Sequence, residues 1–262
     1  MNVDITLPDG SVRNYESPVT GYQIAESIGP RLLKDAICVE IDNKFQDLSY
    51  EISESINIRI VTTKDLDALH ILRHSSAHIL AQAVLNLYPN AQFGVGPSIE
   101  NGFYYDFLFE TPIKENELEN IEKEMKRIAK SAQSFIRSEI TKKDAVKIFK
   151  NQKLKLELIE SAESDEGVGE EIVSTYANDE FIDLCMGPHV PSTSVLKHFK
   201  LTKVSGAYWR GDESNVQLQR IYGTSWFSKE DLDQYLIQQE EAEKRDHRKL
   251  GNELDLFTSS EE

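Results

Sequence analysis

The segments His74-Ser75-Ser76-Ala77-His78 and Asp183-Leu184-Cys185-Met186-Gly187-Pro188-His189 decide how the rest of this 262-residue chain is interpreted. The first lies in a run with helical periodicity, so its two histidines, four residues apart, project from one face of a helix. The second collects an acid, a thiol and an imidazole around Gly-Pro, which predicts a tight loop. If the fold brings the two segments together, one pocket holds three imidazoles, a thiol and a carboxylate.

The composition is that of an ordinary folded protein, with 39% hydrophobic and 28% charged residues. We find no apolar run near the roughly 18 residues of a membrane helix, and the first residues are strand-like rather than a signal peptide. We therefore expect a cytoplasmic protein. Its two cysteines, Cys38 and Cys185, fall in different predicted domains, so a disulfide framework is not expected.

The net charge is −16, from 29 basic and 45 acidic residues, and a body this acidic repels polyphosphates at long range. Any nucleic acid must therefore be held locally. The candidate basic surface, whose members individually read as solvated charges, comprises Lys197, His198, Lys200, Lys203, Arg210 and the stretch Lys244-Arg245-Asp246-His247-Arg248-Lys249.

The first 62 residues predict a small mixed sheet with one helix across it. A hairpin over 2–15 is followed by a short helix near 22–28 that Gly29-Pro30 ends, by strands at 36–41 and 48–52, and by a closing strand at 56–61. This order resembles the ubiquitin-like β-grasp. We find nothing catalytic in this segment.

Helical spacing then runs from Leu66 to Leu87 and places His70, His74 and His78 in one line. Aromatic strand residues follow at 103–107, where core packing is the ordinary role and stacking on a base the alternative. A long amphipathic helix is expected over 118–135, lying on the sheet as a cover.

The remaining pattern predicts a short helix that Thr141 and Asp144 cap, and a strand over 154–158 in which Lys155 lies on the charged face. A mobile loop is expected at 161–171, rich in Ser, Glu and Gly. Strands and turns return over 181–227, and Ser228 with Asp231 caps a final polar helix.

Two kinds of chemistry suit the histidine-cysteine set, beside the plain alternative that these side chains have no joint role. Two histidines at i and i+4 with a further Cys and His could complete a tetrahedral zinc site. A zinc peptidase is disfavoured because the first segment lacks the glutamate of His-Glu-x-x-His. A Cys-His nucleophile requires an exposed and activated Cys185.

Several further motifs carry a family resemblance. They are Gly-Phe-Tyr-Tyr-Asp (102–106), Asp-x-Cys-x-Gly-Pro-His-Val-Pro (183–191), Gly-Ala-Tyr-Trp-Arg-Gly-Asp (206–212), Arg-Ile-Tyr-Gly-Thr (220–224) and Lys-Arg-Asp-His-Arg-Lys-Leu-Gly (244–251). In this order, after a β-grasp segment and His-Ser-x-Ala-His, they resemble the amino-terminal half of the bacterial threonyl-tRNA synthetases.

That resemblance implies an α+β protein in four parts. They are a TGS β-grasp domain (1–62), a larger α+β editing domain shared in outline with the alanyl-tRNA synthetases (66–226), a linker helix (227–250) and the start of a class II catalytic core (251–262). The missing core would hold ATP, Mg²⁺ and Zn²⁺ and would form the family's homodimer, so we expect this chain to be monomeric and to have no ligase activity.

The implied activity is post-transfer editing, the hydrolysis of tRNA(Thr) mischarged with serine. The catalytic residues carried over are His74, His78, Lys155, Asp183, Cys185 and His189, with Tyr105 contacting the terminal adenosine. His74 and His189 would handle water, Lys155 would stabilise negative charge, Asp183 would hold the ammonium or hydroxyl of the substrate, and His78 and Cys185 would shape the pocket.

Two alternatives remain beside editing. A zinc-dependent hydrolase would bind metal through His74, His78, Cys185 and His189, as the alanyl relatives do, whereas the resemblance implies metal-free editing. A non-catalytic fragment would bind tRNA without cleaving its ester. The chain also departs from some relatives at Met186, where they have arginine, and at Ser76, where they have cysteine; the first change removes a positive charge near the RNA.

Overall fold

The computed structural model describes residues 1–161, 167–169 and 171–245. Its first sheet has the strand order β2-β1-β7-β4-β5. These strands are β1 (Asn2–Thr6), β2 (Val12–Glu16), β4 (Ala36–Ile41), β5 (Lys44–Asp47) and β7 (Ile56–Thr62). β1 pairs parallel with β7, and the other pairs in this sheet are antiparallel. Together with a helix, this is the expected β-grasp.

The helix of this domain, α1 (Gly21–Ile28), begins at a capping box in which Thr20 and Gln23 satisfy each other's backbone N–H groups. Only Gly29 separates α1 from a second helix, α2 (Pro30–Asp35), which begins at Pro30. Proline is tolerated at the first helical position, where its missing N–H is not needed. The expected strand at 48–52 is wrong: β5 ends at Asp47, and only β6 (Glu51–Ile52) remains, paired with β3 (Val19–Thr20).

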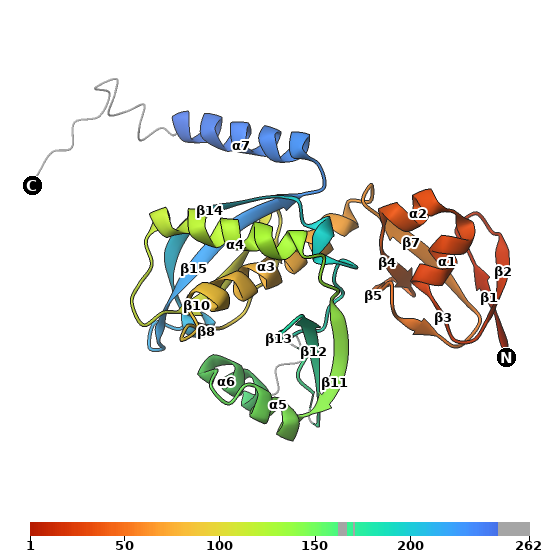
Figure 1. Cartoon of the computed structure of the whole chain (residues 1–262), viewed down its shortest axis with the longest axis horizontal. Coiled ribbons are helices and arrows are strands. Elements are labelled where there is room, and N and C mark those ends of the chain that lie inside the picture. The colour runs from red at the N-terminus through yellow and green to blue at the C-terminus, as the bar shows by residue number, and fades with distance from the viewer. Residues whose placement is uncertain (162–166, 170, 246–262) are drawn as a thin grey trace, which may run out of the picture. The chain divides into compact units, whose positions relative to one another are not determined.

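The second domain is organised around α3 (Asp67–Leu87), which lies against the sheet β14-β15-β10-β8 (Figure 1). The strands are β8 (Gln92–Phe93), β10 (Gly102–Leu108), β14 (His198–Tyr208) and β15 (Gln217–Trp226), and β9 (Ser98–Ile99) pairs with β10. The amphipathic helix α4 (Leu118–Lys130) packs on α3 and β14. It is shorter than expected, since Phe135 lies beyond its end.

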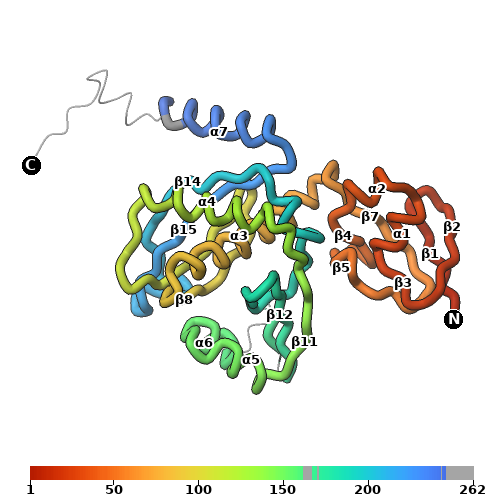
Figure 2. Tube along the Cα trace, viewed as in Figure 1, coloured from red at the N-terminus to blue at the C-terminus, as the bar shows by residue number. Residues whose placement is uncertain are grey.

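A second sheet of this domain has the order β11-β12-β13, from β11 (Ile136–Thr141), β12 (Ile172–Asn178) and β13 (Phe181–Leu184). Figure 2 traces α5 (Lys142–Ile148) and α6 (Lys153–Ser161) beside it. Thr141 caps α5 by accepting a hydrogen bond from the Asp144 N–H, as predicted. The 3₁₀ helices are η1 (Glu115–Glu117), η3 (Thr193–Val195) and η4 (Trp209–Gly211).

The predicted strand at 154–158 is wrong, because these residues form α6. Leucines at alternate positions also include an i, i+4 pair, and Leu154 and Leu158 are both buried on the same side of this helix. Lys155 is buried beside them rather than on a charged face. Most of the predicted loop at 161–171, namely 162–166 and 170, lies outside the described residues.

The last element, α7 (Lys229–Lys244), belongs to a second compact unit that begins at Ser228. Its predicted cap is present, since Ser228 Oγ accepts the Asp231 N–H at 3.1 Å. The end of the expected linker helix and basic stretch, from residue 246 on, lies outside the described residues. Among those described, we find no helix of the length and apolar character needed to span a membrane.

Candidate active site

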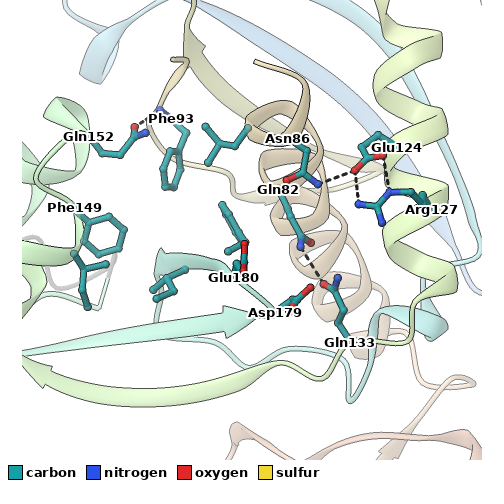
Figure 3. A pocket seen from close by; sticks show the side chains of 14 residues that line it. Gln82, Asn86, Phe93, Glu124, Arg127, Gln133, Phe149, Gln152, Asp179 and Glu180 are labelled. Carbon is teal, nitrogen blue, oxygen red and sulfur yellow. Dashed lines mark hydrogen bonds and ion pairs between the residues drawn. The ribbon is translucent and has the colours of Figure 1, made fainter. Parts of the chain in front are cut away.

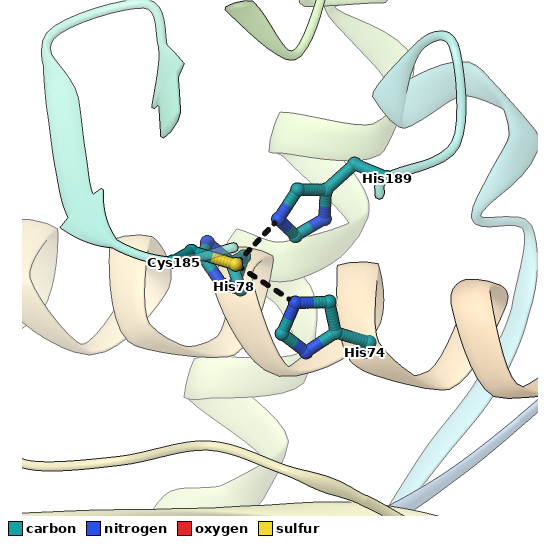
Figure 4. Close-up of side chains that lie close together, drawn as sticks. All are labelled: His74, His78, Cys185 and His189. Carbon is teal, nitrogen blue, oxygen red and sulfur yellow. Dashed lines mark hydrogen bonds between the residues drawn. The ribbon is translucent and has the colours of Figure 1, made fainter. Parts of the chain in front are cut away.

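The two histidine segments meet in one place, although more than a hundred residues separate them. His74 and His78 project from α3, and the segment after β13 places Cys185 and His189 beside them (Figure 4). His74 Nε2 lies 3.0 Å from Cys185 Sγ, and Cys185 Sγ lies 3.4 Å from His189 Nε2. The rings of His74 and His189 stack with centroids 4.6 Å apart. The four side chains therefore form one cluster.

The loop that carries Cys185 and His189 requires glycine at its turn. Gly187 has a backbone φ of +76°, a conformation that residues other than glycine rarely adopt. A Cβ atom there would lie 1.9 Å from the Tyr176 hydroxyl oxygen. Its backbone N–H also donates to Cys185 Sγ at 3.2 Å. The Gly-Pro pair thus lets the loop pass close to Tyr176 while it orients the thiol.

A buried ion pair forms the other side of the site. Lys155 Nζ from α6 lies 2.5 Å from Asp183 Oδ1 at the end of β13, and both side chains are almost completely buried. Tyr105 from β10 donates its hydroxyl to Asp183 Oδ2 at 2.6 Å, and Lys155 donates to the same hydroxyl at 3.2 Å. Tyr105 was expected to contact adenosine, but its side chain is 1% exposed and hydrogen-bonded to the carboxylate.

The three imidazoles are held in the neutral form. Burial lowers the pKa of His74 to about 4, with a smaller contribution from His70. Burial also lowers the pKa values of His78 and His189 well below the usual range, and the neighbouring histidines add to the effect. Burial raises the pKa of the Asp183 carboxyl, and Lys155 and Tyr105 oppose that rise. At neutral pH the site therefore offers unprotonated ring nitrogens as proton acceptors.

Ser75 fixes which nitrogen of His189 carries the proton, a role that the sequence analysis missed. Its hydroxyl donates to Ile71 O at 2.8 Å and accepts the Val190 N–H at 3.0 Å. With the single hydroxyl proton directed to Ile71 O, the 3.0 Å contact with His189 Nδ1 is one in which Nδ1–H donates to Ser75 Oγ. The lone pair of His189 is then on Nε2, which faces Cys185.

The cavity beside this cluster is small. It measures about 170 Å³ and is lined by the three histidines of α3, Tyr105 and the residues 96–98 and 183–187. Pockets for drug-sized ligands measure about 300 to 1,000 Å³. The cavity is therefore smaller than the pockets that hold drug-sized ligands.

A larger hollow of about 840 Å³ lies between α3, α4 and α5 but does not have the same chemistry (Figure 3). Its described lining contains neither histidine nor cysteine. Its polar groups largely pair with one another: Asn86 donates to Glu124 at 2.7 Å, and Arg127 holds the same carboxylate. The cluster around His74 is therefore the better candidate.

The donor atoms of the same cluster are of the kinds that bind zinc. The ligand atoms of His74, His78, Cys185 and His189 lie within 4.8 Å of one another, and Nδ1 of His78 is buried without a hydrogen-bond partner. Tetrahedral zinc places its ligands about 3.3 to 3.8 Å apart. A modest contraction would therefore let these four side chains hold the ion.

The predicted basic surface is partly used within the chain. Lys200 forms an ion pair with Glu122 at 3.1 Å, Lys203 lies over the Tyr222 ring, and Arg210 donates to Ser161 Oγ at 2.7 Å. These contacts leave less free charge on β14 and η4 than the sequence suggested. Residues 246–249 of the second basic stretch lie outside the described residues.

Two family models match the chain. The TGS domain model matches residues 3–62, and the model for the threonyl and alanyl tRNA synthetase second additional domain matches residues 173–222. These matches agree with the expected β-grasp and α+β folds.

Curated relatives match 99% of the chain. Threonine–tRNA ligases from Burkholderia multivorans, Francisella philomiragia and Paraburkholderia phytofirmans are 54%, 52% and 52% identical, respectively. The chain spans about 40% of the length of each of these relatives.

Proposed function

This chain is a relative of the threonine–tRNA ligases with a TGS domain and a second additional domain, and from that premise we propose that it hydrolyses tRNA(Thr) mischarged with serine. The observation that carries the proposal is a small cavity lined by His74, His78 and Asp183, whose carboxylate is paired with the buried Lys155. The proposed partner is tRNA(Thr) and the proposed compartment is the cytoplasm.

A second site is needed because serine and threonine differ by one methyl group. A synthetic pocket built for threonine gains only about 1 to 3 kcal/mol over serine from that group. A hydrolytic cavity can more easily reject the larger amino acid, because the methyl group of threonine can clash with its wall.

The reaction breaks the ester bond between the seryl carbonyl carbon and the terminal ribose oxygen. A water oxygen bonds to the carbonyl carbon, one water proton passes to a basic group, and the ribose oxygen leaves and takes up a proton. His74 and His189 are the proposed proton acceptors, directly or through a ribose hydroxyl, because their Nε2 atoms face the cluster and burial keeps both rings unprotonated at neutral pH.

The remaining side chains have supporting roles in this proposal. Lys155 supplies the positive charge that stabilises the developing oxyanion, and Asp183 holds the ammonium or hydroxyl of the seryl group. Tyr105 holds the Asp183 carboxylate through its hydroxyl, in place of the adenosine contact expected from the resemblance. His78 and Cys185 shape the pocket.

A zinc-dependent hydrolase is the second candidate, favoured by the donor set alone. His74, His78, Cys185 and His189 would hold the ion, which would supply a Lewis acid. However, catalytic zinc keeps one coordination position open for water, and four protein ligands would close the site. A zinc ion bound by all four would therefore be structural.

The test compares the hydrolysis of Ser-tRNA(Thr) with that of Thr-tRNA(Thr), with and without a chelator. We expect rapid loss of the seryl ester, little loss of the threonyl ester and no effect of the chelator. Loss of the seryl activity on chelation, together with one zinc per chain, would favour the metal-dependent hydrolase. Binding of tRNA with no hydrolysis of either ester would leave only the non-catalytic alternative.

A further inference from the structure

A carboxylate of the first domain contacts the loop that carries His189. Asp47, the last residue of β5, accepts the His189 backbone N–H at Oδ1, 2.9 Å away. Its other oxygen, Oδ2, accepts the Tyr176 hydroxyl at 2.6 Å. One side chain therefore joins the β-grasp sheet to two parts of the candidate site, although sequence analysis found nothing catalytic in residues 1–62.

One hydrogen bond of Asp47 holds the loop at His189, and the other holds Tyr176 of β12, which packs against the loop. Tyr176 contacts the loop at Gly187, where there is no space for a Cβ atom between them. The ring of His189 packs edge-on against Tyr176, with centroids 4.5 Å apart. Fixing Tyr176 and the His189 amide together therefore fixes the backbone from Gly187 to His189.

Ser75 and the neighbouring rings also hold His189, and Asp47 adds the restraint on its backbone amide. Its ring is sandwiched between Phe135 and His74, each with centroids 4.6 Å away, and these stacked planes permit sliding. Ser75 holds Nδ1 and thereby sets the tautomer. A hydrogen bond from the backbone amide to a charged group is shorter and about twice as strong as a neutral one. The amide bond to Asp47 thus restrains the motion that the stacked rings allow.

The contact between the domains is supported by apolar packing. Ile37, Cys38 and Val61 of the β-grasp sheet belong to the same buried cluster as the core of the second domain. Asp47 and His189 also both border a cavity of about 660 Å³. Water can therefore reach the His189 N–H if the carboxylate is removed, so the fold can survive the change while the restraint is lost.

We propose that Asp47 is a positioning residue for His189, so that hydrolysis at the second domain depends on the docked first domain. The inference rests on the proposed editing function. It assigns to the TGS domain a part in the chemistry of the editing site, separate from any contact with RNA.

The test compares the effects of substitutions on kcat and on KM in the full 262-residue chain. Asp47→Ala should lower kcat for Ser-tRNA(Thr) hydrolysis by on the order of 10 to 100-fold, because a displacement near 1 Å costs about that much. KM should stay within about two-fold, since the substrate is not expected to touch Asp47. Asp47→Asn keeps an oxygen acceptor for the amide and should recover most of the rate.

Two matched variants separate positioning from general damage. Glu54→Ala removes an exposed carboxylate of the same domain and should leave kcat unchanged. Tyr176→Phe keeps the buried ring and removes only the hydroxyl that donates to Asp47, so its kcat should fall less than that of Asp47→Ala. A loss of kcat in Glu54→Ala equal to that in Asp47→Ala would overturn the proposal.

The amide proton of His189 provides a readout that needs no activity. In proton–nitrogen spectra it should resonate downfield in the wild-type chain and move upfield in Asp47→Ala, with a smaller shift in Asp47→Asn. An active wild type with an unchanged kcat in Asp47→Ala, or a change in KM alone, would refute the positioning role. A wild type that binds tRNA but does not hydrolyse its ester would instead refute the proposed function.

Discussion

The ion pair of Lys155 and Asp183 allows a quantitative test through Lys155→Met. Methionine nearly preserves the volume of the lysine side chain but removes its charge. The two groups are 2.5 Å apart and almost completely buried. Removing one partner of such a pair costs about 3 to 5 kcal/mol, because the other charge stays buried without compensation. That is a large part of the roughly 5 to 15 kcal/mol that stabilises a typical protein.

The loss of stability in Lys155→Met should depend on pH. Burial already raises the pKa of Asp183, and Lys155 is the main group that opposes the rise. In Lys155→Met the folded-state pKa rises further above the unfolded value of about 3.9. When the pKa of a group is higher in the folded state than in the unfolded state, its contribution to stability is complete below the unfolded-state pKa. That contribution is lost as the pH increases through the folded-state pKa. Lys155→Met should therefore be less destabilised at pH 5 than at pH 8.

Urea unfolding of four chains measures this effect. They are the wild type, Lys155→Met, the double variant Lys155→Met/Asp183→Asn, and Lys153→Met as a control on the exposed side of the same helix. The double variant removes both charges and should regain stability to within about 1 kcal/mol of the wild type. A cost below about 1 kcal/mol for Lys155→Met at pH 8, or a double variant no more stable than it, would refute the reasoning.

Four further predictions concern the histidines and metal. His74→Ala should reduce seryl-ester hydrolysis by about 10² to 10⁴-fold in a single-turnover assay, with an unchanged circular dichroism spectrum. Ser75→Ala should give His189 a mixture of tautomers in imidazole nitrogen spectra; a single Nδ1–H form would contradict the assignment. Because the histidine pKa values are lowered in the folded state, the free energy of unfolding should decrease as the pH falls from about 6.5 towards 4, by about 1.4 kcal/mol per pH unit for each proton. Unfolding midpoints that do not change with pH would contradict this. Chelation followed by metal analysis should leave the hydrolysis rate unchanged.

Local patterns in the sequence predicted the features that depend on nearby residues. The four-residue spacing of His74 and His78 placed both rings on one face of α3, and the caps at Thr141 and Ser228 were found from their acidic partners three residues on. Lys155 shows the limit of this method. Alternating leucines suit a strand and also one face of a short helix, and only packing within the second domain decides between them.

Long-range contacts could not be predicted from local patterns. Asp47 is separated from His189 by 142 residues, and it looks like any other polar residue at the end of a strand. Ser75 could have been suspected, since it lies between the two histidines of the motif. Its role nevertheless depends on the single proton of its hydroxyl and on where Val190 lies, which requires coordinates.

The charges of the site decide between the two substrate groups that Asp183 could hold. Lys155 and Asp183 cancel, and the three imidazoles are neutral, so the buried site has no spare negative charge. A substrate ammonium would place a second cation on a carboxylate that Lys155 already neutralises, whereas a hydroxyl would use only a spare lone pair. Within the proposed function, we therefore propose that Asp183 holds the side-chain hydroxyl. Because serine and threonine both carry that hydroxyl, the proposed contact would orient the ester without discriminating, and the proposed selectivity would come from the wall that meets the extra methyl group.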